Sequence, residues 1–431
     1  MIQTDVSLAT SFLTEDEFGE AREKAKDSLE LIRNRNGAGS EMLGWIDILT
    51  EPNDAELEEI DNLASSLRRK ADLFIICGIG GSYLGSRAVI DAMSDYFNMG
   101  SGPEIVFAGH HLGGKYLNDL IRYMKQPGPD GEPKQVYLNV ISKSGSTLET
   151  ALAFRVLRKH LRQMYGEGAR DHIICTTGKE GGVLNDLIDT YGYRKFIIPD
   201  AVGGRFSVLT PVGLFPIAMA GIDIKALFYQ AVSACGELDK EPRQVLDFAA
   251  ARYALFRKGK AVDVITSVEP ELYYIGRWMQ QLFAESEGKE GKGLFPAITT
   301  YTTDLHSLGQ LIQQGRRNII ETFLTVRQGG NGKKIEELKN DTDELNYLAG
   351  KTFHEINSRA QDATIDAHYN GDVPCLKVTL ESISERELGE FIYFFELVTA
   401  IYCYCLDVNP FNQPGVEEYK ETMYKLLGKQ D

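Results

Sequence analysis

Short apolar segments recur along the first half of the chain, and each leads into a loop and then a helical pattern. They occupy residues 71–77, 104–108, 136–142, 172–177 and 195–199. Because these segments carry apolar residues at consecutive positions, both of their faces should be buried. Strands of that kind alternating with helices predict an α/β fold with a parallel sheet covered on each side.

The same alternation returns after a helix-rich stretch at 211–258. Strand candidates lie at 262–267, 321–327 and 375–382, with helical patterns between them, and 389–406 has the pattern of a buried apolar helix. The segment before the first strand has helical spacing as well. The sequence therefore predicts two α/β units with helical segments at both ends.

The charge balance argues against nucleic acid and membranes as partners. The 431 residues include 46 Lys and Arg against 62 Asp and Glu, a net charge of −16. A surface of that sign repels duplex DNA and anionic lipid, although a small anion feels only the field of its own pocket. We find no signal segment and no apolar run of roughly 18 residues, the length that spans a membrane. The six cysteines have no regular spacing, so we expect reduced thiols and a cytoplasmic protein.

Two loops share the features of an anion site. Residues 78–86 (GIGGSYLGS) and 142–150 (SKSGSTLET) each follow an apolar strand and open a helix, where unpaired backbone amides bind anions. The second loop adds polar side chains, namely Ser142, Lys143, Ser144, Ser146 and Thr147. Either loop alone could be an ordinary N-cap. Two of them at strand ends of one sheet favour a ligand such as a phosphate monoester.

Other glycine-rich stretches do not fit nucleotide motifs. The first loop has Tyr83 where a dinucleotide fingerprint needs glycine, and GHHLGGKY at 109–116 lacks the Ser or Thr that follows the lysine of a P-loop. The adjacent His110 and His111 point in different directions on a strand or a helix, so they do not share a metal. No nucleotide or metal is therefore expected.

Four separate residues could carry acid–base or electrostatic chemistry. Arg205 follows two glycines and can hold an oxyanion with its forked donors. Glu285 ends an apolar stretch, a setting that suits a general base. His306 begins a helical segment, and Lys420 lies near the C-terminus. Each also has a structural interpretation, as a salt bridge, a solvated helix end, a structural histidine or a surface lysine.

Longer segments resemble one enzyme family. DAVGGRFSVLT at 200–210 and the stretch from Tyr402 to Lys420, which contains NPFNQPGVEEYK, closely resemble the two signature segments of glucose-6-phosphate isomerases. GIGGSYLG, SKSGSTLET, ESEGK and LHSLGQLIQQG also resemble family motifs and occur in the family's order. The resemblance spans most of the chain, at a length similar to that of compact bacterial members. It departs at Asn412, where many members carry Asp.

The resemblance implies two sugar-isomerase (SIS) domains, each a doubly wound α/β sandwich with a parallel sheet. The boundaries that we expect are a helical N-terminal extension at 1–65, a first SIS-type domain at 66–210 that binds sugar phosphate, a second at 211–405, and a C-terminal segment at 406–431 that carries the catalytic lysine. The family's histidine is supplied by the neighbouring subunit, so a homodimer with shared sites is implied as well.

The activity implied by the resemblance is the reversible isomerisation of glucose 6-phosphate and fructose 6-phosphate in glycolysis and gluconeogenesis. By position, Glu285 matches the base, and His306 and Lys420 match the ring-opening pair. Arg205 matches the residue that stabilises a cis-enediolate intermediate. The positions that match substrate-binding residues are Gly81, Ser82, Ser142, Lys143, Ser144, Thr147, Glu149 and Gln413. No step is a redox step and Arg205 can supply the electrostatic stabilisation, so neither nicotinamide nor a metal is expected.

Three alternative functions can be compared with the sequence. A glucosamine-6-phosphate synthase would need an N-terminal cysteine nucleophile, but the first cysteine is Cys77. An isomerase that also accepts mannose 6-phosphate stays open. A non-catalytic SIS module that senses sugar phosphates would keep the serine loops and could lose the acid–base set, all of which is present here.

Overall fold

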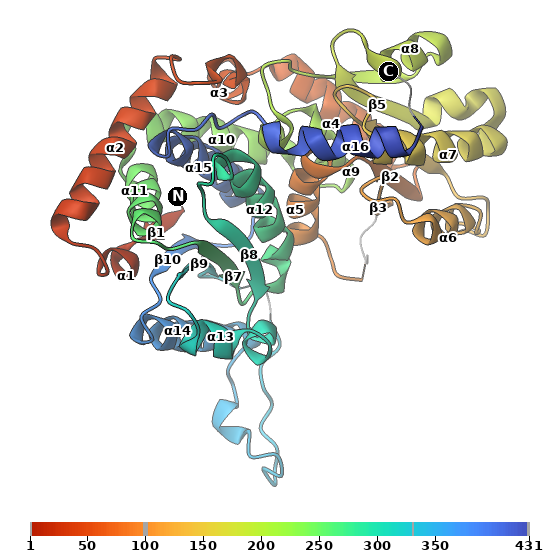
Figure 1. Cartoon of the computed structure of the whole chain (residues 1–431). Helices are drawn as coiled ribbons and strands as arrows, with labels where there is room; N and C mark the ends of the chain where they lie inside the picture. The colour runs from red at the N-terminus through yellow and green to blue at the C-terminus, as the bar shows by residue number, and fades with distance from the viewer. Residues whose placement is uncertain (1, 98–101, 330–331, 429–431) are drawn as a thin grey trace.

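The computed structural model describes residues 2–97, 102–329 and 332–428, which form two lobes around two five-stranded sheets (Figure 1). In spatial order, the strands of the first sheet are β3 (Glu104–Ala108), β2 (Leu73–Cys77), β4 (Val136–Ile141), β5 (Ile173–Gly178) and β6 (Arg194–Ile198). Those of the second sheet are β1 (Gln3–Asp5), β10 (Cys375–Leu380), β9 (Ile319–Val326), β7 (Val262–Ser267) and β8 (Phe295–Thr300). Only β1 runs antiparallel to its neighbour among these strands, so the doubly wound α/β fold is confirmed.

Helices surround both sheets. The N-terminal helices are α1 (Ser7–Thr10), α2 (Glu15–Arg33), α3 (Gly44–Thr50) and α4 (Asp54–Arg68). Those linked to the first sheet are α5 (Leu84–Met93), α6 (Gly114–Met124), α7 (Leu148–Tyr165) and α8 (Gly182–Tyr191). The middle of the chain forms α9 (Pro211–Met219), α10 (Ile224–Lys240), α11 (Arg243–Arg257) and α12 (Tyr273–Glu287). The remaining helices are α13 (Gly309–Gln314), α14 (Phe353–Asn370), α15 (Glu385–Cys405) and α16 (Glu417–Leu426).

Side chains of β2 alternate between two hydrophobic cores, as the period of two in a strand requires. Leu73 and Ile75 pack in the core shared with α6 and α7, whereas Phe74 and Ile76 pack in the larger core shared with α5 and α9. All of these side chains are buried. Burial on both faces explains why this strand is apolar at consecutive positions.

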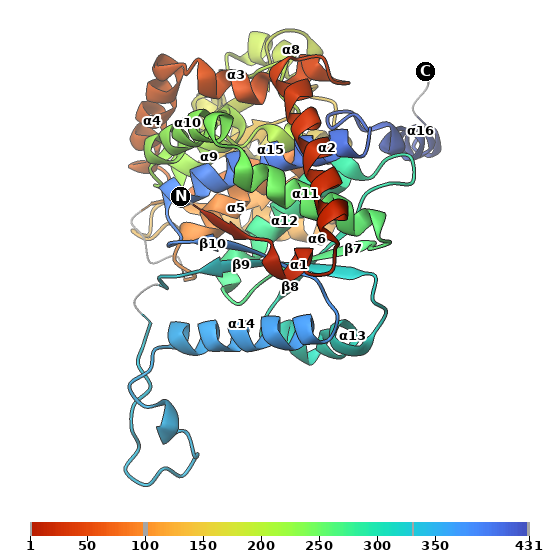
Figure 2. The same cartoon turned by 90° about the vertical axis from the view of Figure 1, so that its left-hand side faces the viewer.

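The second sheet is also covered on both faces. Helices α13 and α14 lie beneath it in Figure 2, and residues such as Ile312 and Ile365 form a core with Val264 and Phe323. Helices α11, α12 and α15 cover the opposite face. The same side-chain alternation thus accounts for the apolar runs in the second half of the chain.

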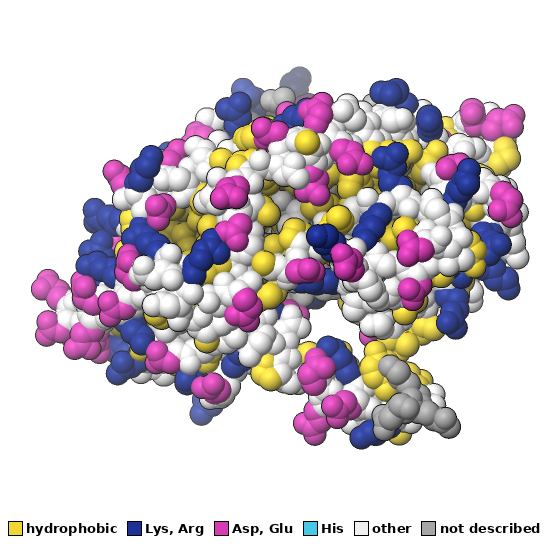
Figure 3. Space-filling view, turned by 90° about the horizontal axis from the view of Figure 1, so that it is seen from above, with side chains coloured by type: hydrophobic (Ala, Val, Ile, Leu, Met, Phe, Trp, Pro, Cys, Tyr) yellow, Lys and Arg dark blue, Asp and Glu magenta, His cyan; other side chains and the backbone are white. Residues whose placement is uncertain are grey.

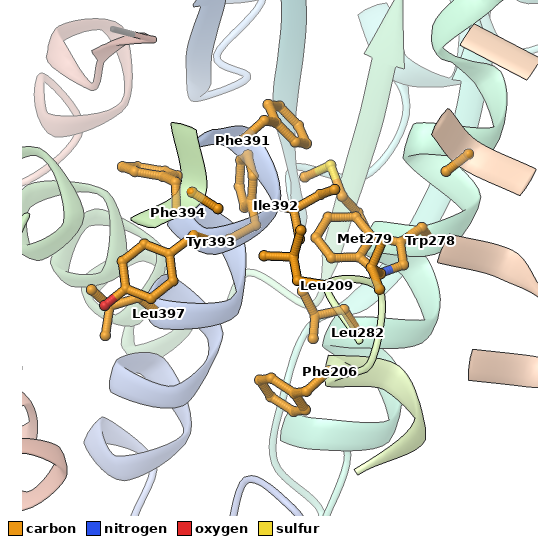
Figure 4. Close-up of a cluster of buried hydrophobic side chains, with 14 of the residues drawn as sticks. Phe206, Leu209, Trp278, Met279, Leu282, Phe391, Ile392, Tyr393, Phe394 and Leu397 are labelled. Carbon is orange, nitrogen blue, oxygen red and sulfur yellow. The ribbon is translucent and has the colours of Figure 1, made fainter. Parts of the chain in front are cut away.

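Helix α15 is the centre of the largest core. It has the length and apolarity of a membrane-crossing helix, contrary to the expectation that no such run is present, but it is buried inside the protein. Figure 4 shows its side chains packed against α12 and against the segment around Phe206. The labelled residues are Phe206, Leu209, Trp278, Met279, Leu282, Phe391, Ile392, Tyr393, Phe394 and Leu397. This packing fixes the turn that carries Arg205 relative to α12, which carries Glu285.

The sequence analysis did not predict two of the strands, and each omission has a physical reason. Strand β8 contains Pro296, which lacks a backbone donor, and it lies at the edge of its sheet, where proline is tolerated. Strand β1 has three residues and lies inside the segment expected to be helical. It pairs with β10, while the amide of Ile2 donates to Glu390 at 2.9 Å. The first residues described therefore belong to the second sheet, and the domain boundaries stay a prediction.

An arm between β9 and α14 projects beyond the second lobe (Figures 1 and 2). Its described residues carry exposed apolar side chains, namely Leu338, Leu345 and Tyr347, and exposed Phe353 follows at the start of α14. On the face shown in Figure 3, acidic and basic side chains are intermingled and form no extended basic patch.

Candidate functional site

The candidate site lies where the winding of the first sheet reverses. From β2 the chain moves outward to β3 and then returns to β4 on the other side, so β2 and β4 flank the switch point. Ligands of open α/β sheets bind outside the carboxyl ends of the strands at such points. A pocket of about 500 Å³ is found here. Its lining includes Gly81, Ser82, Ser144, Ser146, Thr147, Glu149, Arg205, Glu285, Gln413 and Lys420.

The loop after β4 presents hydroxyl groups to this pocket. The hydroxyl of Ser146 donates to Ser144 Oγ at 2.9 Å, and both side chains are exposed. Thr147 precedes α7 but its side chain does not cap that helix, so its hydroxyl is not used by the backbone there. The N-terminus of a helix favours anions. Together, these groups form a cradle for a phosphate or carboxylate.

Two other residues of the same loop have structural contacts instead. Ser142 is buried, and its Oγ accepts the amide of Gly145 at 3.1 Å. The ammonium of Lys143 donates to the carbonyls of Asp200 at 2.8 Å and Val202 at 3.2 Å. Neither side chain lines the pocket among the described residues. Desolvation lowers the pKa of Lys143, and its bonds fasten the loop to the segment before Arg205.

The loop after β2 touches the turn that carries Arg205. A Cβ added to Gly81 would lie 2.0 Å from the carbonyl oxygen of Gly204, so glycine alone fits this contact. Ser82 closes the short 3-10 turn Gly80–Ser82 and lines the pocket with Gly81. The first loop and the 3-10 turn Gly204–Phe206 are thus held in direct backbone contact.

Arg205 is buried and makes contacts with two separate segments, the end of α12 and residues 410–412. Its Nε donates to Ser286 Oγ at 2.7 Å, and its Nη1 lies 3.4 Å from Glu285 Oε2. Its Nη2 donates to the carbonyls of Pro410 and Asn412. Burial lowers the pKa of Arg205, and the neighbouring carboxylate of Glu285 opposes that shift. The guanidinium is therefore a fixed positive charge at the wall of the pocket.

Glu285 lies near the end of α12 with its carboxylate partly exposed to the pocket. Oε1 accepts a hydrogen bond from Gln281 at 3.0 Å, and Oε2 accepts one from Gln413 at 3.0 Å. The expected apolar surroundings are absent on this side, because amides and a guanidinium contact the carboxylate. These donors orient it as a proton acceptor.

The C-terminal helix α16 contributes Lys420, whose ammonium donates to Glu417 Oε1 at 2.9 Å. This hydrogen bond raises the pKa of Lys420, so the side chain is an ammonium at neutral pH. Glu417, Tyr419, Met423 and Tyr424 line the same wall of the pocket. The helix therefore supplies a proton donor at the side of the pocket formed by the C-terminal segment.

His306 lies elsewhere. It is the last residue of the 3-10 turn Thr303–His306, which follows β8 in the second lobe. The side chain is exposed and does not line the pocket among the residues described. In this single chain, His306 is thus separate from Glu285, Arg205 and Lys420.

Residues that the sequence analysis did not single out support the site. Gln281 lies four residues before Glu285, one helical turn away, and this spacing on α12 was the available signal. The role of Ser286 follows only from its contact with Arg205. Below them, fully buried Arg252 contacts Asp263 at 3.1 Å and Glu287 at 3.0 Å. This buried ion cluster anchors the end of α12.

A histidine lies at the corresponding edge of the second sheet. His354 Nδ1 lies 2.9 Å from Glu269 Oε1, just after β7, and its Nε2 lies 3.0 Å from the carbonyl of Arg327, just after β9. A Cβ added to Gly329 would lie 2.1 Å from the His354 ring. The imidazole thus bridges the loops that follow β7 and β9, the two strands at the switch point of the second sheet.

The arrangement can move a proton and stabilise the anion left behind. A carboxylate that accepts protons lies beside a fixed guanidinium, and a hydroxyl-rich helix N-terminus shares the pocket. Within the described ranges, no group of three or more His, Cys, Asp and Glu is placed to hold a metal ion. Side chains of these types in this arrangement can provide acid–base catalysis for a small anionic substrate.

Comparisons with known proteins identify the family. The family profile described as phosphoglucose isomerase matches residues 69–430. The chain is 43% identical to the glucose-6-phosphate isomerase of Fusobacterium nucleatum over 436 residues, which cover 99% of this chain and 96% of that protein. It is 44% identical to the glucose-6-phosphate isomerase of Shouchella clausii over 440 residues, with the same shares covered.

Solved structures share the fold. A hypothetical protein of Thermus thermophilus is 26% identical with a TM-score of 0.86, and 100% of each chain is covered. A glucose-6-phosphate isomerase of Chlamydia trachomatis is 20% identical with a TM-score of 0.76, and 95% of this chain and 84% of that one are covered. The tagatose-6-phosphate ketose/aldose isomerase of Escherichia coli is 12% identical with a TM-score of 0.51, over 91% and 95% of the two chains.

Proposed function

The chain belongs to the phosphoglucose isomerase family, and we propose that the pocket at the switch point of its first sheet is the isomerase site. The reaction is the reversible isomerisation of glucose 6-phosphate and fructose 6-phosphate, the activity of its curated relatives. The observation that carries the assignment of the pocket is the contact of Glu285 with buried Arg205 beside a hydroxyl-rich helix N-terminus.

Glu285 is the base of the proposed proton transfer. In the open-chain aldose its carboxylate takes the proton from C2, and electrons move into the C1 carbonyl to give a cis-enediolate. The C2 hydroxyl then gives its proton to the C1 oxygen, and the protonated Glu285 returns its proton to C1, so that C2 becomes the carbonyl carbon of the ketose. Negative charge builds on the enediolate oxygens, and Arg205 stabilises it at little reorganisation cost because the guanidinium is already held by Ser286 and Pro410.

The phosphate of the substrate binds in the hydroxyl cradle. Ser144, Ser146 and Thr147 donate to its oxygens, and the N-terminus of α7 adds amides and a favourable dipole. Gly81 and Ser82 complete this end of the pocket. Binding energy from the phosphate, remote from the reacting carbons, orients them against Glu285. Ser142 and Lys143 support the cradle from behind through their backbone contacts.

Ring opening needs a second acid–base pair. It adds a proton to the ring oxygen and removes one from the C1 hydroxyl. Lys420, an ammonium in the pocket wall, is one member. We propose His306 of the partner subunit as the other, because His306 is exposed on the second lobe and lies outside the pocket of its own chain.

A homodimer with shared sites follows from that assignment. The projecting arm supports it, because Leu338, Leu345 and Tyr347 are exposed and would be covered by a second copy. A closed two-fold dimer uses each surface twice, so both pockets would be completed alike. Sedimentation velocity measures the oligomeric state, and a monomer at the concentration of the activity assay would contradict the proposed dimer.

We place the enzyme in the cytoplasm, in glycolysis and gluconeogenesis. All six cysteines are free and buried, as in a reducing compartment. Helix α15 is buried in the protein core. On the face shown in Figure 3, acidic and basic side chains are mixed, so this face offers no basic surface for nucleic acid.

The decisive experiment follows glucose 6-phosphate formation from fructose 6-phosphate with a coupled dehydrogenase. Glu285→Gln should lose about 10²- to 10⁴-fold in kcat and still bind fructose 6-phosphate, since the base is removed and the cradle is kept. Glu290→Gln, an exposed carboxylate on the following loop, is the control. Activity that survives Glu285→Gln would contradict this base, and wild-type binding without turnover would favour a sensor. Mannose 6-phosphate is assayed in parallel to test the broader specificity.

A further inference from the structure

The segment 406–413, which we term the linker, joins the end of α15 to the site. It begins directly after Cys405, the last residue of α15, and ends at Gln413, whose amide donates to Glu285 at 3.0 Å. The linker has no regular secondary structure, so its path depends on side-chain contacts. Whatever holds the half of the linker that leads to Gln413 therefore also places one of the hydrogen bonds to the proposed base.

Lys289 ties the linker to the end of α12. Its ammonium donates to the carbonyl of Ser286 at 2.8 Å and to the carbonyl of Asn409. The Asn409 side chain in turn accepts the amide of Phe411 at 2.8 Å, so it turns the chain toward the pocket. Lys289 thus connects the residue after Glu285 to the middle of the linker.

Arg205 makes a parallel connection between the same two segments. It binds the side chain of Ser286 on α12 and the carbonyls of Pro410 and Asn412 on the linker. Lys289 and Arg205 therefore hold Ser286 from its carbonyl and its hydroxyl. The contacts form a closed ring that runs from α12 through the linker and back to Glu285 by way of Gln413.

We propose that Lys289 is a positioning residue of the isomerase, which sets the place of the Gln413 amide against the Glu285 carboxylate by joining α12 to the linker. It does not line the pocket, so it acts through the residues that do. This inference rests on the proposed function of Glu285 as the base. A misplacement of a catalytic group by about 1 Å can cost 10²-fold in rate, so a tether of this kind has a measurable effect.

The surroundings of Lys289 are unusual for a lysine. The charged and titratable groups that face it are Arg205, Glu285 and Cys403. Burial raises the pKa of the Cys403 thiol, which therefore stays neutral. Desolvation lowers the pKa of Lys289 to about 8, and the opposing effect of the Glu285 carboxylate does not offset this shift. An ammonium kept half-buried near a second cation is costly, and a surface position would avoid that cost.

Lys292 provides a matched control on the same loop. Its ammonium donates to the carbonyl of Leu406 at 2.9 Å, and it also contacts Glu290 at 3.1 Å. Like Lys289, it is half-buried and holds a carbonyl of the linker. It differs in holding the end next to α15, away from Gln413. If the loss of any contact to the linker lowered the rate, substitution of either lysine would do so. The proposal instead expects a lower rate only when Lys289 is substituted.

The first test compares Lys289→Met, Lys289→Arg and Lys292→Met by steady-state kinetics and thermal unfolding. Lys289→Met should lower kcat about 10- to 100-fold with a smaller change in KM, because positioning and not binding is lost. Lys289→Arg should recover most of this activity, and Lys292→Met should keep wild-type kcat. Equal losses in the two Met variants would overturn the proposal. If Lys289→Met does not fold, the proposal is tested by the activity of Lys289→Arg and by the pH profile of kcat.

The second test is the alkaline side of the kcat profile. Wild-type kcat should fall as pH rises through about 8, because the ammonium loses the charge that strengthens its two hydrogen bonds. In Lys289→Arg this limb should move up by about one pH unit or more, because arginine stays charged. An unmoved limb would overturn the proposal. Glu285→Gln, run alongside, separates failure of this inference from failure of the proposed base, because only the latter leaves that variant active.

Discussion

Arg205 and Glu285 meet at 3.4 Å in the wall of the pocket, and the carboxylate is the more exposed of the two. The arginine side chain is 1% exposed and the glutamate side chain 32%. The cation is therefore fixed by the protein, whereas the carboxylate can reach a substrate. A charge that is already in place need not reorganise when an anion forms beside it, which is the condition for electrostatic catalysis.

Arg205→Lys tests this fixed charge. Lysine keeps the charge but cannot bind Ser286, Glu285 and the linker carbonyls at once, so kcat should fall by about 10²- to 10³-fold. Carbonyls left unpaired in a buried site should also lower the free energy of unfolding, by roughly 1–3 kcal/mol. Exposed Arg122→Lys is the control for the substitution itself. A folded variant with wild-type kcat would remove Arg205 from the mechanism.

Gly81→Ala tests the contact between the first loop and the Arg205 turn. The new Cβ would lie 2.0 Å from the Gly204 carbonyl, so one of the two backbones must move. Overpacking of this kind costs about 1–3 kcal/mol in the free energy of unfolding, and KM for fructose 6-phosphate should rise because the cradle shifts. Gly114→Ala has no heavy atom within 4 Å of its Cβ and should change neither quantity. Equal behaviour of the two variants would show that the contact is not rigid.

A histidine near the first loop gives a pH test of stability. His110 stacks on Tyr83 with ring centroids 5.0 Å apart, and desolvation lowers its pKa to about 4. The unfolded chain takes up this proton near pH 6.5, and the folded chain only near 4, so stability is lost as pH falls between them.

His110→Gln removes that titration. The stability advantage of the wild type over the variant should therefore shrink steadily as pH falls from about 6.5 to 4. Urea unfolding at several pH values measures the difference directly. A constant difference across this range would mean that His110 titrates alike in both states.

The sequence predicted strands where burial makes them apolar at consecutive positions, and it missed them where other forces decide. Strand β2 shows the first case, since Leu73 and Phe74 face two separate cores. Strand β8 shows the second, because Pro296 is tolerated only at a sheet edge, which no local pattern reveals.

The sequence predicted which types of residue form the site, but it did not predict how their side chains are arranged. The hydroxyls of 142–147 were visible in the sequence, but which of them face a ligand depends on contacts made by distant segments. The Asp200 carbonyl turns Lys143 away from the pocket, for example. The tether that Lys289 makes to the carbonyl of Asn409 needs the linker, which lies more than a hundred residues further along the chain.

The sharing of sites between two copies has its own test, because two inactive variants can complement each other. Glu285→Gln removes the base and leaves His306, whereas His306→Gln removes the histidine and leaves the base. If His306 of the partner subunit completes each pocket, a mixed dimer has one pocket with both groups intact and one with neither. Each variant alone has no intact pocket.

Co-expression of the two variants, or their joint refolding, should therefore restore activity to about a quarter of wild type, since half of random dimers are mixed and each has one complete pocket of two. If His306 instead served its own chain, every pocket in every mixture would lack one group, and no activity would return. Ring opening is the step at stake, so the assay uses the closed-ring substrate, glucose 6-phosphate. Restored turnover in the mixture would establish that the exposed histidine on the second lobe acts across the interface.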